Sequence, residues 1–300
     1  EDNYQNVTTF ELANPEETVV GEIDKKDVLP GGSLTWAFNK EMQMRAAASS
    51  TVNRPDFKEL SSAPYIDPVT RDVIIGNPNL EQAEVTNLDL KWEWYVTHFE
   101  GMSVSLFYKD FINPIERTLL PGGGDSNVYS FINADAATNA GIELEGRAWL
   151  SRFFGRSFSG TYIESNLAVI DSNVVLGDQS GQLTSTSRPL QGQAPWIINL
   201  TLGYENLVSQ SSANLLFNMA GEFIFDVGTQ GIPDAYVQPV PTLDFVYKKA
   251  FFRGREDNLH LAIKVKNILD PDIEVLRGGE LERSYTKGTT ISAQLKYSWK

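Results

Sequence analysis

The two histidines are the side chains of this sequence best suited to acid–base or metal chemistry near neutral pH. The chain has only His98 and His260, and it has no cysteine. His98 lies in a predicted short turn and His260 in a predicted strand, so the two form no cluster that would bind a transition metal or a haem. No G-x-S-x-G segment places a serine nucleophile on a strand-to-helix turn. We therefore predict no catalytic residue, no metal and no cofactor, and we do not expect an enzyme.

Closely spaced acids are a second candidate chemistry, because calcium is bound by several oxygen ligands. Asp67 with Asp72, and Glu280 with Glu282, are pairs of this kind. Neither pair has the ligand spacing of an EF-hand loop. We interpret them as solvated acids in loops.

Composition narrows the classes of protein further. The 300 residues include 41% hydrophobic and 21% charged side chains, which predicts a folded chain. The net charge of −14 argues against a nucleic-acid partner, because such binding depends on clustered Lys and Arg. The lack of cysteine suits an oxidising compartment.

Hydrophobic residues alternate with polar ones in the segment NLDLKWEWYVTHFEGMSVSLFYKDF, residues 87–111. Leu88, Leu90, Trp92 and Trp94 fall on one face of a strand, and the residues between them are polar or charged. After THFEG the alternation resumes, so the two runs predict an antiparallel hairpin. Its apolar face could pack on a soluble core or face lipid.

The same alternation predicts eleven strands and an all-β fold. Most of the runs have ten or more residues, longer than soluble strands usually are and long enough to cross a bilayer. No segment has helical periodicity, and no apolar run of about eighteen residues predicts a membrane helix. The predicted strands are residues 33–38, 42–52, 85–96, 102–115, 140–150, 157–167, 196–205, 213–225, 241–252, 258–268 and 289–299.

The connections between these strands alternate strictly in length. Short turns such as NKE, THFEG and SRFFGR alternate with long connections at residues 53–84, 116–139, 168–195, 226–239 and 269–288. Short turns on one rim and long loops on the other are typical of an outer-membrane β-barrel.

Aromatic residues cluster where the strands approach the short turns, as expected for a belt at a membrane interface. A soluble antiparallel sheet could use the same rings to fill its core, so this alternative stays open. The predicted belt consists of Trp36, Trp92, Trp94, Trp149, Tyr204, Phe251, Tyr297 and Trp299.

Eleven strands cannot form a complete bacterial barrel, because these barrels have even strand numbers and no free edges. Eleven more strands before Glu1 would give a barrel of about 22, the size of the plugged outer-membrane transporters. The chain opens without an initiator Met or a signal-peptide pattern, which predicts a mature or cut fragment. We therefore expect residues 1–300 to be the C-terminal portion of a transmembrane antiparallel barrel, with residues 1–32 an extracellular loop leading into the first strand.

Four motifs in register resemble those of TonB-dependent outer-membrane receptors. They are NRPDFKEL, GNPNL, YKDFINPIE and NADAATNAGIELE, and the chain ends in NILDP followed by ISAQLKYSWK. Glycines in these motifs have structural roles: Gly76 marks the return of a loop to the barrel, and Gly141 marks a close approach at a strand. The blocks cover most of residues 34–300.

This resemblance implies a receptor of the Gram-negative outer membrane that imports an extracellular ligand. In the family an N-terminal plug blocks the lumen, and an inner-membrane complex pulls on the plug through TonB. No plug and no TonB box is recognised in these 300 residues, so we expect the plug and the remaining barrel strands to be partners of this chain. The ligand class is open among siderophore, glycan, peptide and vitamin.

If the chain forms part of such a barrel, its ligand should contact the long loops and the upper lumen. Tyrosine rings stack on flat ligands, and arginines clamp carboxylates. An equally weighted alternative is that these residues pair with loop acids. The candidates are Tyr65, Arg71, Arg117, Tyr129, Arg188, Tyr236, Arg277 and Arg283.

Two other classes of protein share the strand pattern. A passive porin or a structural barrel subunit would have the strands and loops without a plug, and a soluble adhesive β-sandwich would have no lipid contact. Heat-modifiable migration on a gel distinguishes a detergent-resistant barrel from a sandwich.

Overall fold

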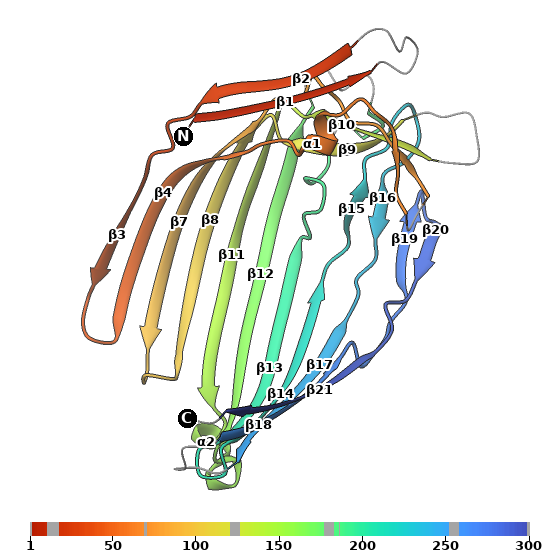
Figure 1. Cartoon of the computed structure of the whole chain (residues 1–300). Coiled ribbons are helices and arrows are strands. Elements are labelled where there is room, and N and C mark those ends of the chain that lie inside the picture. Colours follow the sequence, from red (N-terminus) through yellow and green to blue (C-terminus); the bar gives the residue numbers. More distant parts are fainter. Residues whose placement is uncertain are drawn as a thin grey trace.

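A computed structural model describes residues 2–10, 18–68, 71–120, 127–176, 183–185, 187–251 and 258–298. Its main element is an antiparallel sheet of 11 strands in which every strand pairs with its neighbours in chain order (Figure 1). Within the described ranges the two edge strands, β3 and β21, do not pair with each other, so the sheet is a curved open wall. The strands are β3 (Gly31–Ala37), β4 (Met42–Asn53), β7 (Ala83–Tyr95), β8 (Gly101–Ile112), β11 (Ala136–Trp149), β12 (Thr161–Val175), β13 (Trp196–Asn206), β14 (Ser211–Ala220), β17 (Thr242–Phe251), β18 (Asn258–Lys266) and β21 (Thr290–Ser298).

The all-β fold class and the number of eleven strands are therefore confirmed. Some bounds differ: the strand predicted at 157–167 is Thr161–Val175, and the strand predicted at 213–225 ends at Ala220 and is followed by a separate short strand. The register of the eleven strands keeps apolar residues on one face, because side chains alternate with a period of two along a strand. Leu90 lies between Ala46 and Leu106, and on the opposite face Lys91 lies between Arg45 and Ser105. The sheet thus has one apolar face and one polar face along its whole width.

The apolar face is exposed. Leu88 and Leu90 are 46% and 40% accessible although they lie on an inner strand of the sheet. An exposed apolar surface of this extent is unfavourable in water and suits contact with lipid. Further exposed members are Leu34, Trp36, Leu106, Ile142, Leu144, Leu167, Ile198, Leu200, Leu202, Leu215, Ile291 and Leu295.

Short turns close one end of the sheet, and the turn between β11 and β12 holds α2 (Ser151–Phe154) and the 3₁₀ helix η1 (Arg156–Phe158). These are single helical turns, in keeping with the lack of helical periodicity. No helix in the described segments is long and apolar enough to cross a membrane.

The belt prediction is wrong for Trp149. Trp149 pairs with Tyr162 and lies on the same face as Arg147, because the two residues are two positions apart on β11. Its ring stacks on Phe99 at 4.0 Å between centroids, and the Arg147 guanidinium lies 3.4 Å from the Phe99 centroid. Trp149 therefore belongs to an aromatic–arginine cluster on the polar face.

The other described belt residues lie on the apolar face. The register places Trp36 and Trp92 on either side of Met44, and it places Tyr297 beside Leu259. Trp94, Tyr204 and Phe251 also follow the apolar alternation. Their position at a membrane interface stays a prediction, and Trp299 lies outside the described residues.

Short strands that the sequence pattern did not predict occupy the other end of the sheet. One four-stranded sheet has the order β5 (Tyr65–Ile66), β6 (Val73–Ile74), β10 (Val128–Asn133), β9 (Ile115–Leu120). The other has the order β15 (Phe223–Asp226), β16 (Ala235–Val237), β19 (Ile273–Arg277), β20 (Glu280–Tyr285). We call these two sheets together the loop layer, and they lie at the upper end of the sheet in Figure 1.

An N-terminal hairpin of β1 (Asp2–Phe10) and β2 (Thr18–Lys26) lies beside the loop layer (Figure 1). Ile23 of the hairpin packs on Leu60 and Leu80, next to α1 (Phe57–Leu60). Asp56 caps this helix, because its side chain accepts a hydrogen bond from the Lys58 backbone N–H at 3.2 Å. The assignment of residues 1–32 to an extracellular loop stays a prediction.

The buried core lies mostly at the loop end, because both faces of the large sheet are open. Ile224, Val227 and Leu183 pack there with Ala137 and Val174, the last two from the ends of β11 and β12. Gly141 is the predicted close approach: a Cβ at this position would lie 2.5 Å from the Phe107 ring. The loop end is therefore the packed part of the chain.

Candidate functional site

The two sheets of the loop layer are joined along the edges of β9 and β15. The Leu119 N–H donates to the Val227 carbonyl at 3.0 Å, and Thr118 forms a parallel bridge with Val227. Gln191 bonds to both sides, since its Nε2 donates to the carbonyls of Phe225 (2.6 Å) and Arg117 (3.1 Å). The five long connections therefore form one continuous surface.

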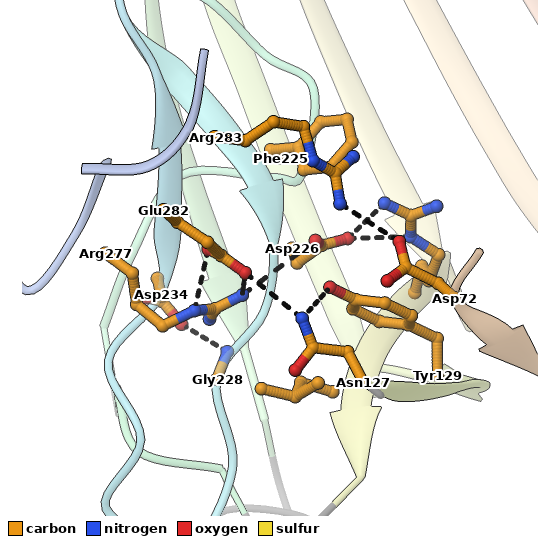
Figure 2. Close-up of polar contacts among 12 residues, drawn as sticks. Asp72, Asn127, Tyr129, Phe225, Asp226, Gly228, Asp234, Arg277, Glu282 and Arg283 are labelled. Atoms are coloured by element: carbon orange, nitrogen blue, oxygen red, sulfur yellow. Dashed lines mark hydrogen bonds and ion pairs between the residues drawn. The ribbon is translucent and has the colours of Figure 1, made fainter. Parts of the chain in front are cut away.

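Asp226 lies at the centre of a polar cluster within this surface (Figure 2). Its side chain is 1% exposed, and its Oδ1 accepts a hydrogen bond from Arg117 Nε at 2.7 Å. The Arg117 guanidinium also lies 4.8 Å from the Tyr129 ring centroid and 4.7 Å from that of Phe225. The planar cation is therefore held by a carboxylate and by two aromatic rings.

Two more arginines surround this centre (Figure 2). Arg277 Nε donates to Glu282 at 2.9 Å, and its guanidinium is 3.9 Å from Asp226 Oδ2. Arg283 bonds to Asp72 at 3.0 Å, which connects residues 211 positions apart in the sequence. Three arginines therefore face three acids, Asp72, Asp226 and Glu282, and the formal charge of the cluster balances.

Burial controls the protonation of the central groups. It raises the pKa of Asp226, against the lowering effect of the Arg117 and Arg277 guanidiniums. It also raises the pKa of Tyr129 far above its usual range, and the neighbouring carboxylates add to this shift. Tyr129 is therefore a neutral phenol, suited to hydrogen bonding and stacking and unsuited to acid–base chemistry.

A second buried pair lies beside this cluster. Arg188 donates two parallel hydrogen bonds to Glu116, at 2.7 and 2.6 Å, and both side chains are 1% exposed. The Gln191 backbone N–H also donates to Glu116 at 3.1 Å. A ligand cannot reach this pair from solvent, so its role is to hold the loops together.

The structure thus brings Arg117, Tyr129, Arg277 and Arg283 together, as candidates for one site should be. Each of four candidate arginines, Arg117, Arg188, Arg277 and Arg283, also forms an ion pair with an acid of the loops. This is the alternative to ligand binding that the sequence left open. Of these acids, Glu116 lies in the NPIE motif, so the sequence offers a signal that could have indicated it as an arginine partner. Nothing in the local sequence around Asp226 indicates that it is the central partner.

The remaining candidates are Tyr65, Tyr236 and Arg71. Tyr65 packs beside Tyr129, with Lys58 Nζ 5.3 Å from its ring centroid. Tyr236 lines a cavity of about 380 Å³ with Asp234 and Glu222. Arg71 is exposed at a turn with a φ of 62°.

One acid of each suspected calcium-binding pair bonds to an arginine side chain. Asp72 bonds to Arg283, and Glu282 bonds to Arg277. Within the described ranges no group of three or more His, Asp or Glu side chains could hold a metal ion. The loop acids act as counter-charges for arginine.

The polar face of the large sheet forms the second candidate surface. Lys91 bonds to Glu145 at 2.8 Å, and Arg45 bonds to Glu93 at 2.9 Å. Lys91, Glu93 and Glu145 line a cavity of about 540 Å³ on this face. Asparagines continue this hydrogen-bonded surface: Asn218 donates to Asn199 at 2.7 Å, and Asn199 donates to Asn166 at 3.1 Å. The paired charges suit a wet lumen.

A long antiparallel meander with a lipid-compatible face, a polar face and a loop layer at one end defines a wall of an outer-membrane β-barrel. The family model described as "TonB dependent receptor-like, beta-barrel" matches residues 2–268, and the chain belongs to this family. No curated protein sequence matches the chain.

Solved structures of three receptors resemble the fold. A variant of the ferric enterobactin receptor of Pseudomonas aeruginosa in complex with enterobactin has 16% identity and a TM-score of 0.57, over 94% of this chain and 42% of that one. The siderophore receptor PirA of Acinetobacter baumannii has 14% identity, a TM-score of 0.58, and coverage of 94% and 41%. The FrpB iron transporter of Neisseria meningitidis has 10% identity, a TM-score of 0.54, and coverage of 95% and 40%. At these identities the likeness is one of fold, and the chain spans about two fifths of the length of these proteins.

Proposed function

We propose that this chain is the C-terminal part of the barrel of an outer-membrane receptor that binds an extracellular ligand and imports it with energy delivered through TonB. The family match supports the receptor class. The observation that carries the proposal is the sheet itself, which separates an exposed apolar face from a polar face and has a packed loop layer at one end. The apolar face would contact lipid in the outer membrane of a Gram-negative bacterium.

The whole receptor would need parts that lie outside this chain. The remaining barrel strands would pair with β3 and β21, which removes the two open edges. A plug domain would occupy the lumen against the polar face, and TonB would act on the plug. This chain would supply part of the wall and part of the binding surface.

The ligand would contact the exposed parts of the loop layer. Arg117, Arg188, Arg277 and Arg283 would position the loops, because each already has a carboxylate partner. Arg71 and the cavity beside Tyr236 are better placed to touch a ligand, since Arg71 is exposed and the cavity is open to several polar groups. Ferric siderophores are the first class to screen because the similar structures are named as a ferric enterobactin receptor, a siderophore receptor and an iron transporter. Glycans, peptides and vitamins follow.

The proposal is tested by uptake through the full-length receptor in cells with and without TonB. Radiolabelled ferric siderophores, and then members of the other classes, are supplied to cells that carry the receptor as their sole route for that ligand. We expect at least one ligand to accumulate against its gradient only when TonB is present. Uptake that is equal in both strains and follows the external concentration would favour a passive porin instead.

A further inference from the structure

The cavity of about 380 Å³ beside Tyr236 is lined by charges of one sign. Its charged lining residues are Asp234 and Glu222, and Ser185 and Gln238 add neutral polar groups. None of the described residues that line it is basic. Its charge therefore suits a cationic group better than an anionic one.

Asp234 differs from the other buried acids of the chain. It is one of four acidic residues that are buried within the described ranges, and it is 4% exposed. The other three each form an ion pair with an arginine, whereas no Lys or Arg of the described residues forms one with Asp234. The three pairs are Glu100 with Arg152, Glu116 with Arg188, and Asp226 with Arg117.

Neutral donors bond to the Asp234 carboxylate. Ser185 Oγ donates to it at 2.6 Å, and the Gly228 backbone N–H donates at 2.8 Å (Figure 2). Arg277 comes close, because it donates to the Pro233 carbonyl at 2.7 Å, but its guanidinium forms ion pairs with other acids. A carboxylate buried without a counter-charge is unfavourable, so a cation that entered the cavity would be stabilised there.

Tyr236 adds an aromatic ring to the two carboxylates. Burial raises the pKa of Tyr236, and the nearby carboxylates of Asp234 and Glu222 add to this increase, so both negative charges act close to the phenol. The face of an aromatic ring attracts ammonium and guanidinium groups. A ring beside two carboxylates, in a cavity larger than a bare ion needs, suits an organic cation.

The loop end as a whole has an excess of acids. Residues 1–30, 54–82, 113–135, 176–195, 221–241 and 267–289 together carry 25 acidic and 10 basic residues, whereas the rest of the chain carries 14 and 15. Such a rim attracts cations that approach from outside and repels anions. The long-range field and the cavity therefore favour the same sign of ligand charge.

We infer that the cavity beside Tyr236 binds an ammonium or guanidinium group of the ligand, with Asp234 and Glu222 as its counter-charges. That this cation belongs to an imported ligand rests on the proposed function. The inference narrows the open ligand classes to members that carry such a group, for example amine-bearing siderophores, amino sugars and basic peptides. A ligand whose charged groups are all anionic would not enter this cavity.

Binding of a small ammonium probe to the full-length receptor tests the inference. The probe is fluorobenzylammonium, its neutral counterpart is fluorobenzyl alcohol, and fluorine NMR measures the dissociation constant of each for the receptor in lipid nanodiscs. Asp234→Asn removes the buried charge and keeps polar atoms that can bond to Ser185 and Gly228. Asp272→Asn is the matched control, because it makes the same change at an exposed residue that does not line the cavity.

We expect the wild type and the control to bind the ammonium probe about tenfold more tightly than the alcohol. Asp234→Asn should weaken binding of the ammonium probe about tenfold and leave binding of the alcohol unchanged. Glu222→Gln should weaken it about threefold, and this exposed position keeps the test valid if Asp234→Asn does not fold.

Equal affinities for the two probes, or an ammonium affinity that neither variant changes, would overturn the inference. The proposed function would then still stand on the uptake experiment with and without TonB. Uptake that is independent of TonB, with ammonium binding that depends on Asp234, would instead overturn the proposed function and leave a cation site at the loop end.

Discussion

The loop layer and the eleven-stranded sheet differ in where their stabilising contacts lie. The loop layer has a packed core, and four arginines, Arg117, Arg188, Arg277 and Arg283, are paired there with acids of the same chain. The sheet has no core of its own, since one face is exposed and apolar and the other is polar and open. The loop layer can therefore hold its geometry through its own contacts, whereas the sheet depends on lipid, on a lumen and on further strands.

The largest effect should come from breaking the buried pair of the loop layer. Arg188→Ala would leave Glu116 buried without its partner, so we expect a loss of about 3–5 kcal/mol in the free energy of unfolding of this layer. Urea-dependent proteolysis of the loops in the full-length receptor measures this loss. Replacing both residues together, by Met at 188 and Leu at 116, should restore most of the stability. Equal damage from the single and double variants would contradict this account.

The sheet should be most sensitive to charge on its apolar face. Leu90→Arg should cost about 2–4 kcal/mol if Leu90 lies near the bilayer midplane, because arginine would face hydrocarbon. The fraction of barrel that resists unfolding in detergent, seen as heat-modifiable migration, measures the effect. Ser105→Arg is the control, since Ser105 pairs with Lys91 on the polar face. A neutral outcome for Leu90→Arg would count against the membrane orientation of the sheet.

At the short-turn end, an acid-sensitive contact joins the aromatic cluster to the turns. Arg152 donates to Glu100 at 2.6 and 2.9 Å, and the backbone N–H of Trp149 donates to Glu100 at 3.2 Å. The hydrogen bond from Arg152 lowers the pKa of Glu100 the most, so the stabilisation is present above pH 4.5 and is lost as pH falls through the lowered value. We expect Glu100→Gln to cost about 1–2 kcal/mol at neutral pH and to remove this acid dependence. Parallel pH profiles of the two proteins would contradict the assignment.

The smallest effect on stability should come from the exposed candidate arginine. Arg71→Ala should change the free energy of unfolding by less than about 0.5 kcal/mol, because Arg71 is exposed at a turn. If Arg71 contacts the ligand, the same variant should weaken ligand affinity in isothermal titration of the full-length receptor. Arg117→Ala should instead lower the free energy of unfolding more than it weakens ligand affinity. Unchanged affinity for Arg71→Ala would remove this residue from the binding surface.

Regular alternation made the large sheet predictable, because a period of two over ten residues has few other interpretations. The loop layer was not predictable in the same way. Its strands are as short as β5 and β16, and β6 pairs with β10 in parallel across a gap of more than fifty residues. Strands of two or three residues show no period, so tertiary contacts decide their structure.

The sequence predicted which residue types gather at the candidate site better than it predicted what each residue does there. The tyrosines and arginines of the long connections were found, but the partners that neutralise the arginines are up to 211 positions away. For Trp149 the signal was present, since it has the same parity as Glu145 and Arg147 along β11. Trp149 lies near a turn, where aromatic residues often face lipid, but it follows the alternation of its strand and lies on the polar face.

Side-specific labelling measures which parts of the sheet face the cell exterior, the lipid and the periplasm. These 300 residues contain no cysteine, so single cysteines can be placed at Arg71, Leu90 and Lys40 of a full-length receptor from which any other cysteine has been removed, and probed with a membrane-impermeant maleimide. If the sheet is an outer-membrane wall with its long connections outside, intact cells should label position 71, only permeabilised cells should label position 40, and position 90 should stay unlabelled until the protein is unfolded. Labelling of position 40 in intact cells, or of position 90 in the folded receptor, would contradict the account.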